Sequence, residues 1–304
     1  MAAGEDAGLS PVTSRRRLCG ELRRERFMRG VTQEEVARGL NWSPSKVIRI
    51  EGGVSNISVN HLNALLRFYA ITDSDRVAQL VSLARRARQR AWWHEYKTVI
   101  SPGTENLLGL EPDARVIRVY SQLIPALLQT PAYAREVLEF PTARMDGADS
   151  GTPEQRVEVL LHRQRGLFNR TTLPELVFVV DEVALNRCPL DPTVMVDQLG
   201  RLVTAAESFG ITLHVLPLSA DLRAGLISPF ELLEFGNDDS VLVIENQFGL
   251  LYVETQAVIR QCRDAFDHLQ GVALSPGASL DFIRARRVAS SDFPQATCST
   301  EVSQ

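Results

Sequence analysis

Residues 32–53 read TQEEVARGLNWSPSKVIRIEGG, and this stretch decides the fold of the first part of the chain. Thr32 and Glu35 have the spacing of a capping box, which predicts that a helix begins after Thr32. Ser43 predicts the N-cap of a second helix, with Pro44 at its first position. The two glycines that close the stretch predict the end of that helix. The pattern therefore predicts two short helices joined by a tight turn.

The second of these helices is predicted to have an apolar and a polar face. Val47, Ile50 and part of Ile48 are expected to form the inner face. The outer face carries short polar or long cationic side chains, namely Ser45, Lys46 and Arg49. This pattern is typical of a helix-turn-helix, whose second helix can enter the major groove of DNA. The alternative is an ordinary helical hairpin with a solvated polar face.

The stretch resembles the Xre-type (phage-repressor-like) helix-turn-helix family. The positions that match the family's motif are Gln33, Ala37, Ser43, Val47, Ile50, Glu51 and Gly53. It departs from the family at Asn41 and Trp42, where Gly-Val is usual. In the family, an arginine near the end of the preceding helix pairs with the glutamate that closes the recognition helix. The resemblance therefore implies a structural ion pair between Arg26 and Glu51.

The predicted partner is double-stranded DNA. We expect Ser45 and Arg49 to contact base edges, Arg49 at a guanine, and Lys46 to contact either bases or phosphates. A homodimer would place two recognition helices about 34 Å apart on an inverted repeat. The residues expected to bind phosphates are Gln33, Ser43 and Thr32, the last two through helix N-termini.

The charge of the chain is unevenly distributed. Residues 15–97 contain 17 Lys and Arg against 8 Asp and Glu, although the whole chain has a net charge of -4. A basic segment joined to an acidic remainder suits a domain that binds a polyanion. A charge imbalance without a partner is the alternative.

Composition excludes several other classes. No apolar run approaches the roughly 18 residues of a membrane span. The N-terminal residues lack the pattern of a signal peptide, and the four cysteines and five histidines are scattered. We therefore expect reduced thiols, no metal, no cofactor, no membrane, and a cytoplasmic, nucleoid-associated protein.

The predicted fold class is multidomain α plus α/β. The predicted divisions are a disordered leader (1–14), a five-helix lambda-repressor-like DNA-binding domain (15–90), a mixed α/β regulatory domain (91–288) and a flexible tail (289–304). The first helix is expected over residues 16–29, with Phe27 packed inside. Trp92, Trp93 and Tyr96 are expected to pack between the two domains, with a ligand-stacking surface as the alternative.

In the second domain, hydrophobic periodicity predicts alternating strands and helices. Strands are expected at residues 115–123, 176–180, 212–216, 230–235, 241–245 and 250–253. Helices are expected at residues 132–140, 153–168, 191–209, 254–272 and 279–287.

A series of segments of the second domain, beginning with Trp92 and Trp93, carries a wider resemblance. They include IPALLQTPAYAREVL (124–138), RVEVLLHRQRGLF (156–168) and FVVDEVALNR (178–187). The chain is similar over residues 16–287 to actinobacterial helix-turn-helix regulators with a C-terminal domain of unassigned function, described as antitoxin-like or developmental. The resemblance implies a small partner protein and a role in development or antibiotic production. Ala126 replaces a family glycine, and residues 243–245 blur a Tyr-x-Glu motif.

The sequence does not indicate an enzyme. Asp181 and Glu182 are adjacent carboxylates, but neighbouring strand residues point to opposite faces, and capping a helix near Val183 is the expected role. No nucleophile elbow, phosphate-binding loop or metal motif is present. We expect a regulator whose C-terminal domain binds a small partner protein. The alternatives are an antitoxin that mainly neutralises its partner and a regulator that senses a small molecule.

Overall fold

The computed structural model describes residues 8–139, 151–187, 191–236, 238–246 and 248–291. The chain forms two compact units, Met1–Glu95 and Tyr96–Gln304. The division lies a few residues after the predicted boundary at 90, beyond the two tryptophans of the short 3-10 helix η1 (Trp92–Tyr96).

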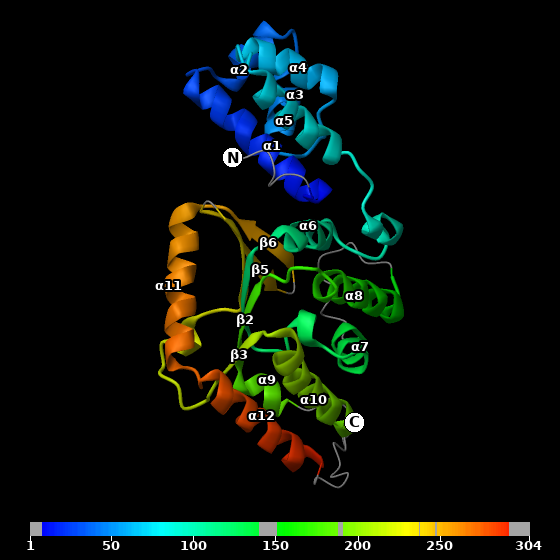
Figure 1. The fold of residues 1–304 in the computed structure, drawn as a ribbon, viewed down its shortest axis with the longest axis vertical. Helices are drawn as coiled ribbons and strands as arrows, with labels where there is room; N and C mark the ends of the chain where they lie inside the picture. The colour runs from blue at the N-terminus through cyan, green and yellow to red at the C-terminus, as the bar shows by residue number, and fades with distance from the viewer. Residues whose placement is uncertain (1–7, 140–150, 188–190, 237, 247, 292–304) are drawn as a thin grey trace, which may run out of the picture. The chain divides into compact units, whose positions relative to one another are not determined.

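The described part of the N-terminal unit contains a bundle of five α-helices (Figure 1). In chain order they are α1 (Pro11–Met28), α2 (Gln33–Gly39), α3 (Pro44–Glu51), α4 (Val59–Phe68) and α5 (Ser74–Arg86). Side-chain oxygens of Ser10, Thr32, Ser58 and Asp73 accept backbone N–H groups at the starts of four of them. These caps satisfy amides that have no partner within a helix, which fixes where each helix begins.

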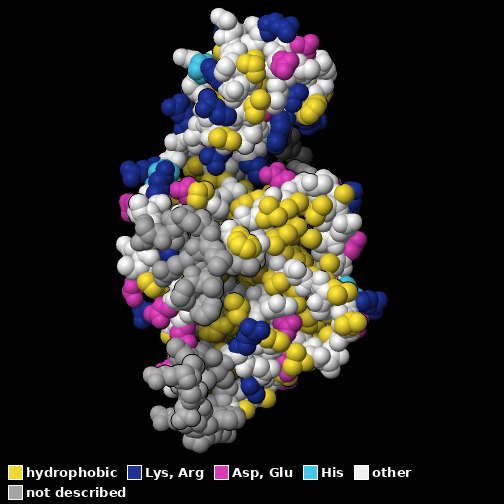
Figure 2. Space-filling model, turned by 180° about the vertical axis from the view of Figure 1, so that it is seen from behind, with side chains coloured by type: hydrophobic (Ala, Val, Ile, Leu, Met, Phe, Trp, Pro, Cys, Tyr) yellow, Lys and Arg dark blue, Asp and Glu magenta, His cyan; other side chains and the backbone are white. Residues whose placement is uncertain are grey.

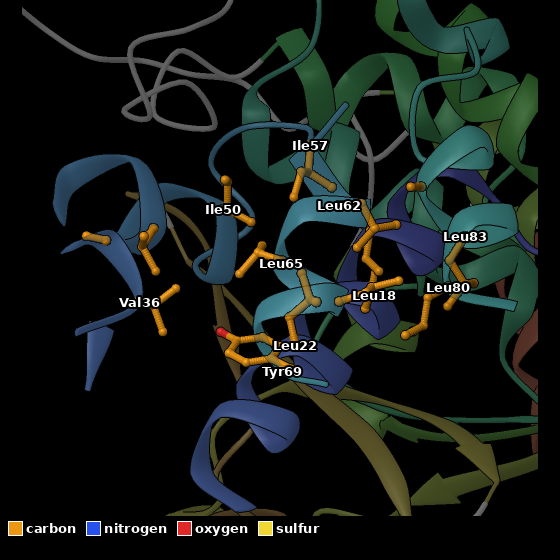
Figure 3. Close-up of a cluster of buried hydrophobic side chains, with 14 residues drawn as sticks. Leu18, Leu22, Val36, Ile50, Ile57, Leu62, Leu65, Tyr69, Leu80 and Leu83 are labelled. Atoms are coloured by element: carbon orange, nitrogen blue, oxygen red, sulfur yellow. The ribbon is translucent and has the colours of Figure 1, made fainter. Parts of the chain in front are cut away.

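Aliphatic side chains from all five helices form one core (Figure 3). Leu22, Val36, Leu62 and Leu80 are essentially inaccessible to solvent. Tyr69 is the large aromatic residue of this core and is also fully buried. Each such side chain contributes about 1.5–3 kcal/mol on burial, so the core fixes α2 and α3 against the other helices.

The first helix corrects two sequence predictions. It begins at Pro11 rather than at residue 16, because Ser10 caps it and Pro11 occupies its first position, so part of the predicted leader is helical. Phe27 is 69% exposed and lies outside the core. Its ring instead lies 4.5 Å from the guanidinium carbon of Arg26.

The C-terminal unit is built on a mixed sheet of six strands in the order β3-β2-β1-β4-β5-β6. The strands are β1 (Val116–Ser121), β2 (Glu175–Asp181), β3 (Thr212–Leu216), β4 (Phe230–Gly236), β5 (Asp239–Asn246) and β6 (Gly249–Val253). The first three are parallel to one another, and β4 to β6 continue the sheet as antiparallel neighbours. In β2, residues Leu176 to Val180 are all apolar and buried, as is usual for a strand covered on both faces.

Helices cover both faces of this sheet (Figure 1). They are α6 (Pro102–Leu110), α7 (Pro131–Glu139), α8 (Pro153–Phe168), α9 (Glu182–Asn186), α10 (Pro192–Phe209), α11 (Gln256–Val272) and α12 (Pro276–Ser291), with short 3-10 turns η2 (Glu111–Asp113), η3 (Ala126–Leu128) and η5 (Ala224–Leu226). Helix α11 packs through Ile259, Phe266 and Leu269 on the face formed by Tyr120, Leu232 and their neighbours. The α8 and α6 helices lie on the opposite face.

The order of elements agrees with the predicted mixed α/β fold. Helix α6 was not predicted, although Ser101 and Pro102 repeat the start signal of Ser43 and Pro44. Helix α12 extends to Ser291, beyond the predicted start of a flexible tail at 289, and residues 292–304 lie outside the described ranges. None of the helices in the described ranges has the combination of length and apolar character that a membrane span needs.

Candidate nucleic-acid interface

Helices α2 and α3 form the predicted helix-turn-helix. Asn41 adopts the left-handed conformation, with a φ of 54°, in the turn between them. Asparagine tolerates this region better than most residues. The backbone N–H of Trp42 donates to the carbonyl oxygen of Ala37 at 2.8 Å, which ends α2 and fixes the direction of the turn.

Helix α3 has a buried side and an exposed side. Val47 and Ile50 are buried in the core. Ser45, Ile48 and Arg49 are exposed and have the i, i+3, i+4 spacing of one helix face. Ile48 is 53% exposed, which corrects its predicted inward position. Its methyl groups add an apolar surface that the sequence analysis missed.

The N-terminal ends of the two helices differ. The Thr32 hydroxyl accepts from the Glu35 backbone N–H, while Glu35 accepts from the backbone N–H of Thr32 at 2.7 Å. These hydrogen bonds hold the pKa of the Glu35 carboxyl below its ordinary value. Ser43 occupies the predicted N-cap position, but its side chain makes no capping hydrogen bond. The exposed Ser43 hydroxyl therefore differs from that of Thr32 in not being held by its own helix.

A buried ion pair joins α1 to the end of α3. The Arg26 Nε donates to both carboxylate oxygens of Glu51, at 2.9 and 3.1 Å, and its Nη1 donates to the Val31 carbonyl oxygen. The Gln33 side-chain amide donates to Glu51 Oε2 at 2.8 Å. Glu51 is 3% exposed, so the arrangement locks three helices together away from solvent. The pair lies where the family resemblance implies it, and the phosphate contact of Gln33 stays a prediction.

Lys46 belongs to a cluster that sequence reasoning did not anticipate. Its Nζ lies 3.9 Å from the ring centroid of Trp42, a cation–π geometry, and 3.1 Å from His61 Nε2. The Trp42 and His61 rings contact each other edge to face. The departure from the family pattern at Trp42 was the available signal. The DNA contact of Lys46 stays a prediction.

The two units differ in the surfaces they present. Lys and Arg side chains are spread over the N-terminal unit, whereas hydrophobic side chains gather on the C-terminal unit, in the face that Figure 2 draws. Exposed arginines of α1 and its C-cap include Arg23, Arg24 and Arg29. They carry the positive charge expected of a surface that attracts a polyanion.

The adjacent carboxylates of the C-terminal unit have structural partners. Asp181 caps α9 by accepting from the Val183 backbone N–H at 2.9 Å. Glu182 accepts from the backbone N–H of Leu218 and from the side chain of Asn186. Within the described ranges, no cluster of His, Cys, Asp or Glu is arranged to hold a metal ion.

Comparisons with known families separate the two units in the same way. Residues 17–80 match a family described as a helix-turn-helix domain. Residues 104–285 match a family described as a domain of unknown function, DUF5753. No curated protein and no solved structure matches the chain. The chain therefore belongs to the DUF5753 family of proteins, and its helix-turn-helix domain is that of a DNA-binding regulator.

Proposed function

We propose that the protein is a sequence-specific transcriptional regulator of the Xre type that binds double-stranded DNA as a homodimer on an inverted repeat. The observation that carries the proposal is the exposed face of α3, where Ser45, Ile48 and Arg49 project from a helix fixed by the core. The basic N-terminal unit supports it, because positive charge supplies most of the affinity for the phosphate backbone.

Each exposed side chain of α3 suits a different part of a base pair. The Arg49 guanidinium matches the O6 and N7 acceptors of guanine, the Ser45 hydroxyl can donate or accept, and the Ile48 side chain suits a thymine methyl group. Thr32, Ser43 and the helix N-termini provide phosphate contacts. Gln33 and Lys46 are held by Glu51 and Trp42, so their proposed part is to position the two helices as well as to contact DNA.

The C-terminal domain is proposed to regulate this binding. The sequence resemblance favours a small partner protein, as in antitoxin-like or developmental regulators of actinobacteria. A cavity in the domain favours the alternative of a small-molecule effector. Catalysis is not part of the proposal, because the Asp181 and Glu182 carboxylates accept hydrogen bonds from backbone N–H groups of their own domain. The proposed location is the cytoplasm, at the nucleoid.

The test is to recover DNA bound by the full-length protein from a genomic fragment pool and to repeat the selection with Arg49→Ala. The wild type should enrich a few sites that share an inverted repeat. Arg49→Ala should lose about 1–3 kcal/mol of affinity for those sites, which is about 5- to 150-fold. Its affinity for random DNA should change little.

The matched control is Arg85→Ala, which removes one exposed arginine from α5. It should leave the ratio of specific to random binding unchanged. An equal loss on selected and random DNA by Arg49→Ala would assign Arg49 to a phosphate. Failure of the wild type to enrich any shared sequence would overturn the proposed function.

A further inference from the structure

The C-terminal unit contains a cavity of about 320 Å³ between the sheet and the helices α6 and α8. Its volume lies at the lower end of the range of small-molecule sites. Most of its lining is aliphatic or aromatic, including Leu107, Leu160 and Phe178. Such a cavity binds apolar groups by releasing water from its walls.

One carboxylate interrupts the apolar floor of this cavity. The strand register places Glu231 of β4 between Val119 of β1 and Val243 of β5, with Phe178 of β2 next in the same row. All four residues line the cavity. A glutamate in the middle of such a row loses hydration, so its carboxylate needs a partner of opposite charge or a hydrogen-bond donor.

The protein supplies that partner only in part. Arg163 donates from Nε and Nη2 to the two carboxylate oxygens of Glu111, both at 2.8 Å. Glu231 Oε2 lies at 3.4 Å from the same Nη2, and Glu231 Oε1 is buried without a hydrogen-bond partner among the described residues. Arg163 therefore binds Glu111 through two short hydrogen bonds and Glu231 through one longer contact, which leaves one oxygen of Glu231 unsatisfied.

The surrounding charges leave an excess of negative charge. Glu231 and Glu245 line the cavity with Arg156 and Arg163, and Glu111 lies against Arg163. Burial raises the pKa of Glu231 to about 7, the nearby Arg163 opposes that rise, and Glu111 and Glu245 add to it. A cation in the cavity would therefore relieve both the missing hydrogen bond and the repulsion among the carboxylates.

We propose that this cavity binds a small, mainly apolar molecule with a protonated amine, whose N–H group donates to Glu231 Oε1. Its apolar part lies against Val119, Phe178 and Val243, and the exposed Glu245 provides a second negative charge. The further inference that the cavity is the effector site of a regulator rests on the proposed function. The binding itself does not depend on DNA.

The experiment measures binding of three similarly shaped probes to the full-length protein by calorimetry, without DNA, at a pH above 7, where Glu231 is ionised. The probes are phenethylamine, phenethyl alcohol and phenylacetate. The wild type should bind phenethylamine about tenfold or more tightly than the other two, because a hydrogen bond between charged groups adds at least that factor. Glu231→Gln should lose this preference.

Two further variants separate the site from general effects. Glu158→Gln removes an exposed carboxylate from α8 outside the cavity and should bind like the wild type. Ala126→Phe adds a ring to the cavity wall and should weaken binding of all three probes.

Three results would overturn the inference. They are no measurable binding of phenethylamine, tighter binding of phenylacetate than of phenethylamine, or equal amine binding by the wild type and Glu231→Gln. None of them would alter the DNA selection described above. Conversely, a chain that selects no DNA sequence but binds the amine through Glu231 would contradict the proposed function alone.

Discussion

Each unit of the protein buries an arginine against a glutamate, but only one of the two clusters is complete. In the N-terminal unit, Glu51 accepts from Arg26 and Gln33, so both of its oxygens have partners. In the C-terminal unit, Arg163 faces Glu111 and Glu231, and one oxygen of Glu231 has no partner among the described residues. A complete cluster fastens helices together. An incomplete cluster beside a cavity leaves an acceptor to which a ligand in the cavity could donate a hydrogen bond.

The largest expected effect is in the complete cluster. Arg26→Ala leaves the Glu51 carboxylate buried with only the Gln33 amide, and should reduce the free energy of unfolding of the N-terminal unit by about 3–5 kcal/mol. Trp42 packs against the core of that unit, so the change in its fluorescence during urea unfolding reports on that unit. The exposed Arg23→Ala is the control and should unfold like the wild type. Unchanged unfolding with lost DNA binding would show that Arg26 contacts DNA instead.

A change in the incomplete cluster should have a smaller effect. Glu111→Gln removes one charge from the pair with Arg163, but Glu231 remains beside the guanidinium. We expect the free energy of unfolding of the C-terminal unit to fall by about 2–3 kcal/mol. The loss is smaller because Arg163 keeps the charged Glu231 beside it, whereas Arg26→Ala leaves Glu51 without a charged partner. Hydrogen exchange of peptides from β4 measures this loss of stability, with Glu158→Gln as the control. A loss as large as that of Arg26→Ala would mean that Glu231 gives no compensation.

Much of the fold follows from local signals in the sequence. Helix α8 begins at Pro153 and ends at Phe168, as predicted, because Thr152 and Gln155 form a capping box and apolar residues recur at helical spacing. Strand β3 also has its predicted bounds. Helix α6 was missed because its apolar residues are concentrated at its C-terminal end, where they give no periodicity, although the cap at Ser101 was visible.

The two candidate sites were predicted to different extents. The helix-turn-helix lies within a short stretch, so residue spacing alone indicates Ser45 and Arg49 as the outer face of α3. The exposure of Ile48 depends on how the core packs, which spacing does not determine. The Glu231 cluster joins residues 52 and 68 positions apart in the chain, so no local pattern indicates it. Only the strand register and the placement of α8 bring Arg163 to it.

The pH dependence of stability tests the incomplete cluster directly. The folded-state pKa of Glu231 is raised from 4.5 to about 7, so between these values the folded protein holds a proton that the unfolded chain releases. The stability contributed by Glu231 should therefore fall as the pH rises from about 4.5 to about 7, and level off above that pH. Glu231→Gln should remove this decline and make the C-terminal unit about 1–2 kcal/mol more stable than the wild type above that pH.

The same neighbours surround position 231 in the wild type and in Glu231→Gln. They are Arg156 and Arg163 from α8, Glu111 from η2, Glu245 from β5 and Tyr252 from β6. The difference between the two pH profiles, measured by hydrogen exchange of β4 peptides, therefore reports on Glu231. Parallel profiles would show that Glu231 has an ordinary pKa in the folded protein.

The smallest effect concerns two tyrosines that also differ in hydrogen-bond satisfaction, but with the two units reversed. The Tyr69 hydroxyl is buried in the N-terminal core without a hydrogen-bond partner among the described residues, and burial raises its pKa well above the ordinary value. Tyr252 of the C-terminal unit donates its hydroxyl to the Gly103 carbonyl oxygen at 2.6 Å. Tyr69→Phe should be neutral or stabilise its unit by less than about 1 kcal/mol, whereas Tyr252→Phe should destabilise its own by about 0.5–1.5 kcal/mol.

The measurements are tryptophan fluorescence for Tyr69→Phe and hydrogen exchange of β6 peptides for Tyr252→Phe. Both changes remove one oxygen from a largely buried ring, so burial by itself would predict the same sign for both. Changes of opposite sign in the free energy of unfolding would show that hydrogen-bond satisfaction decides how each substitution affects stability. The comparison of the two clusters requires this result. A clear loss of stability in Tyr69→Phe would mean that its hydroxyl has a bound partner, such as a water molecule beside Glu51. The Tyr69 hydroxyl would then be satisfied, as the Tyr252 hydroxyl is by Gly103.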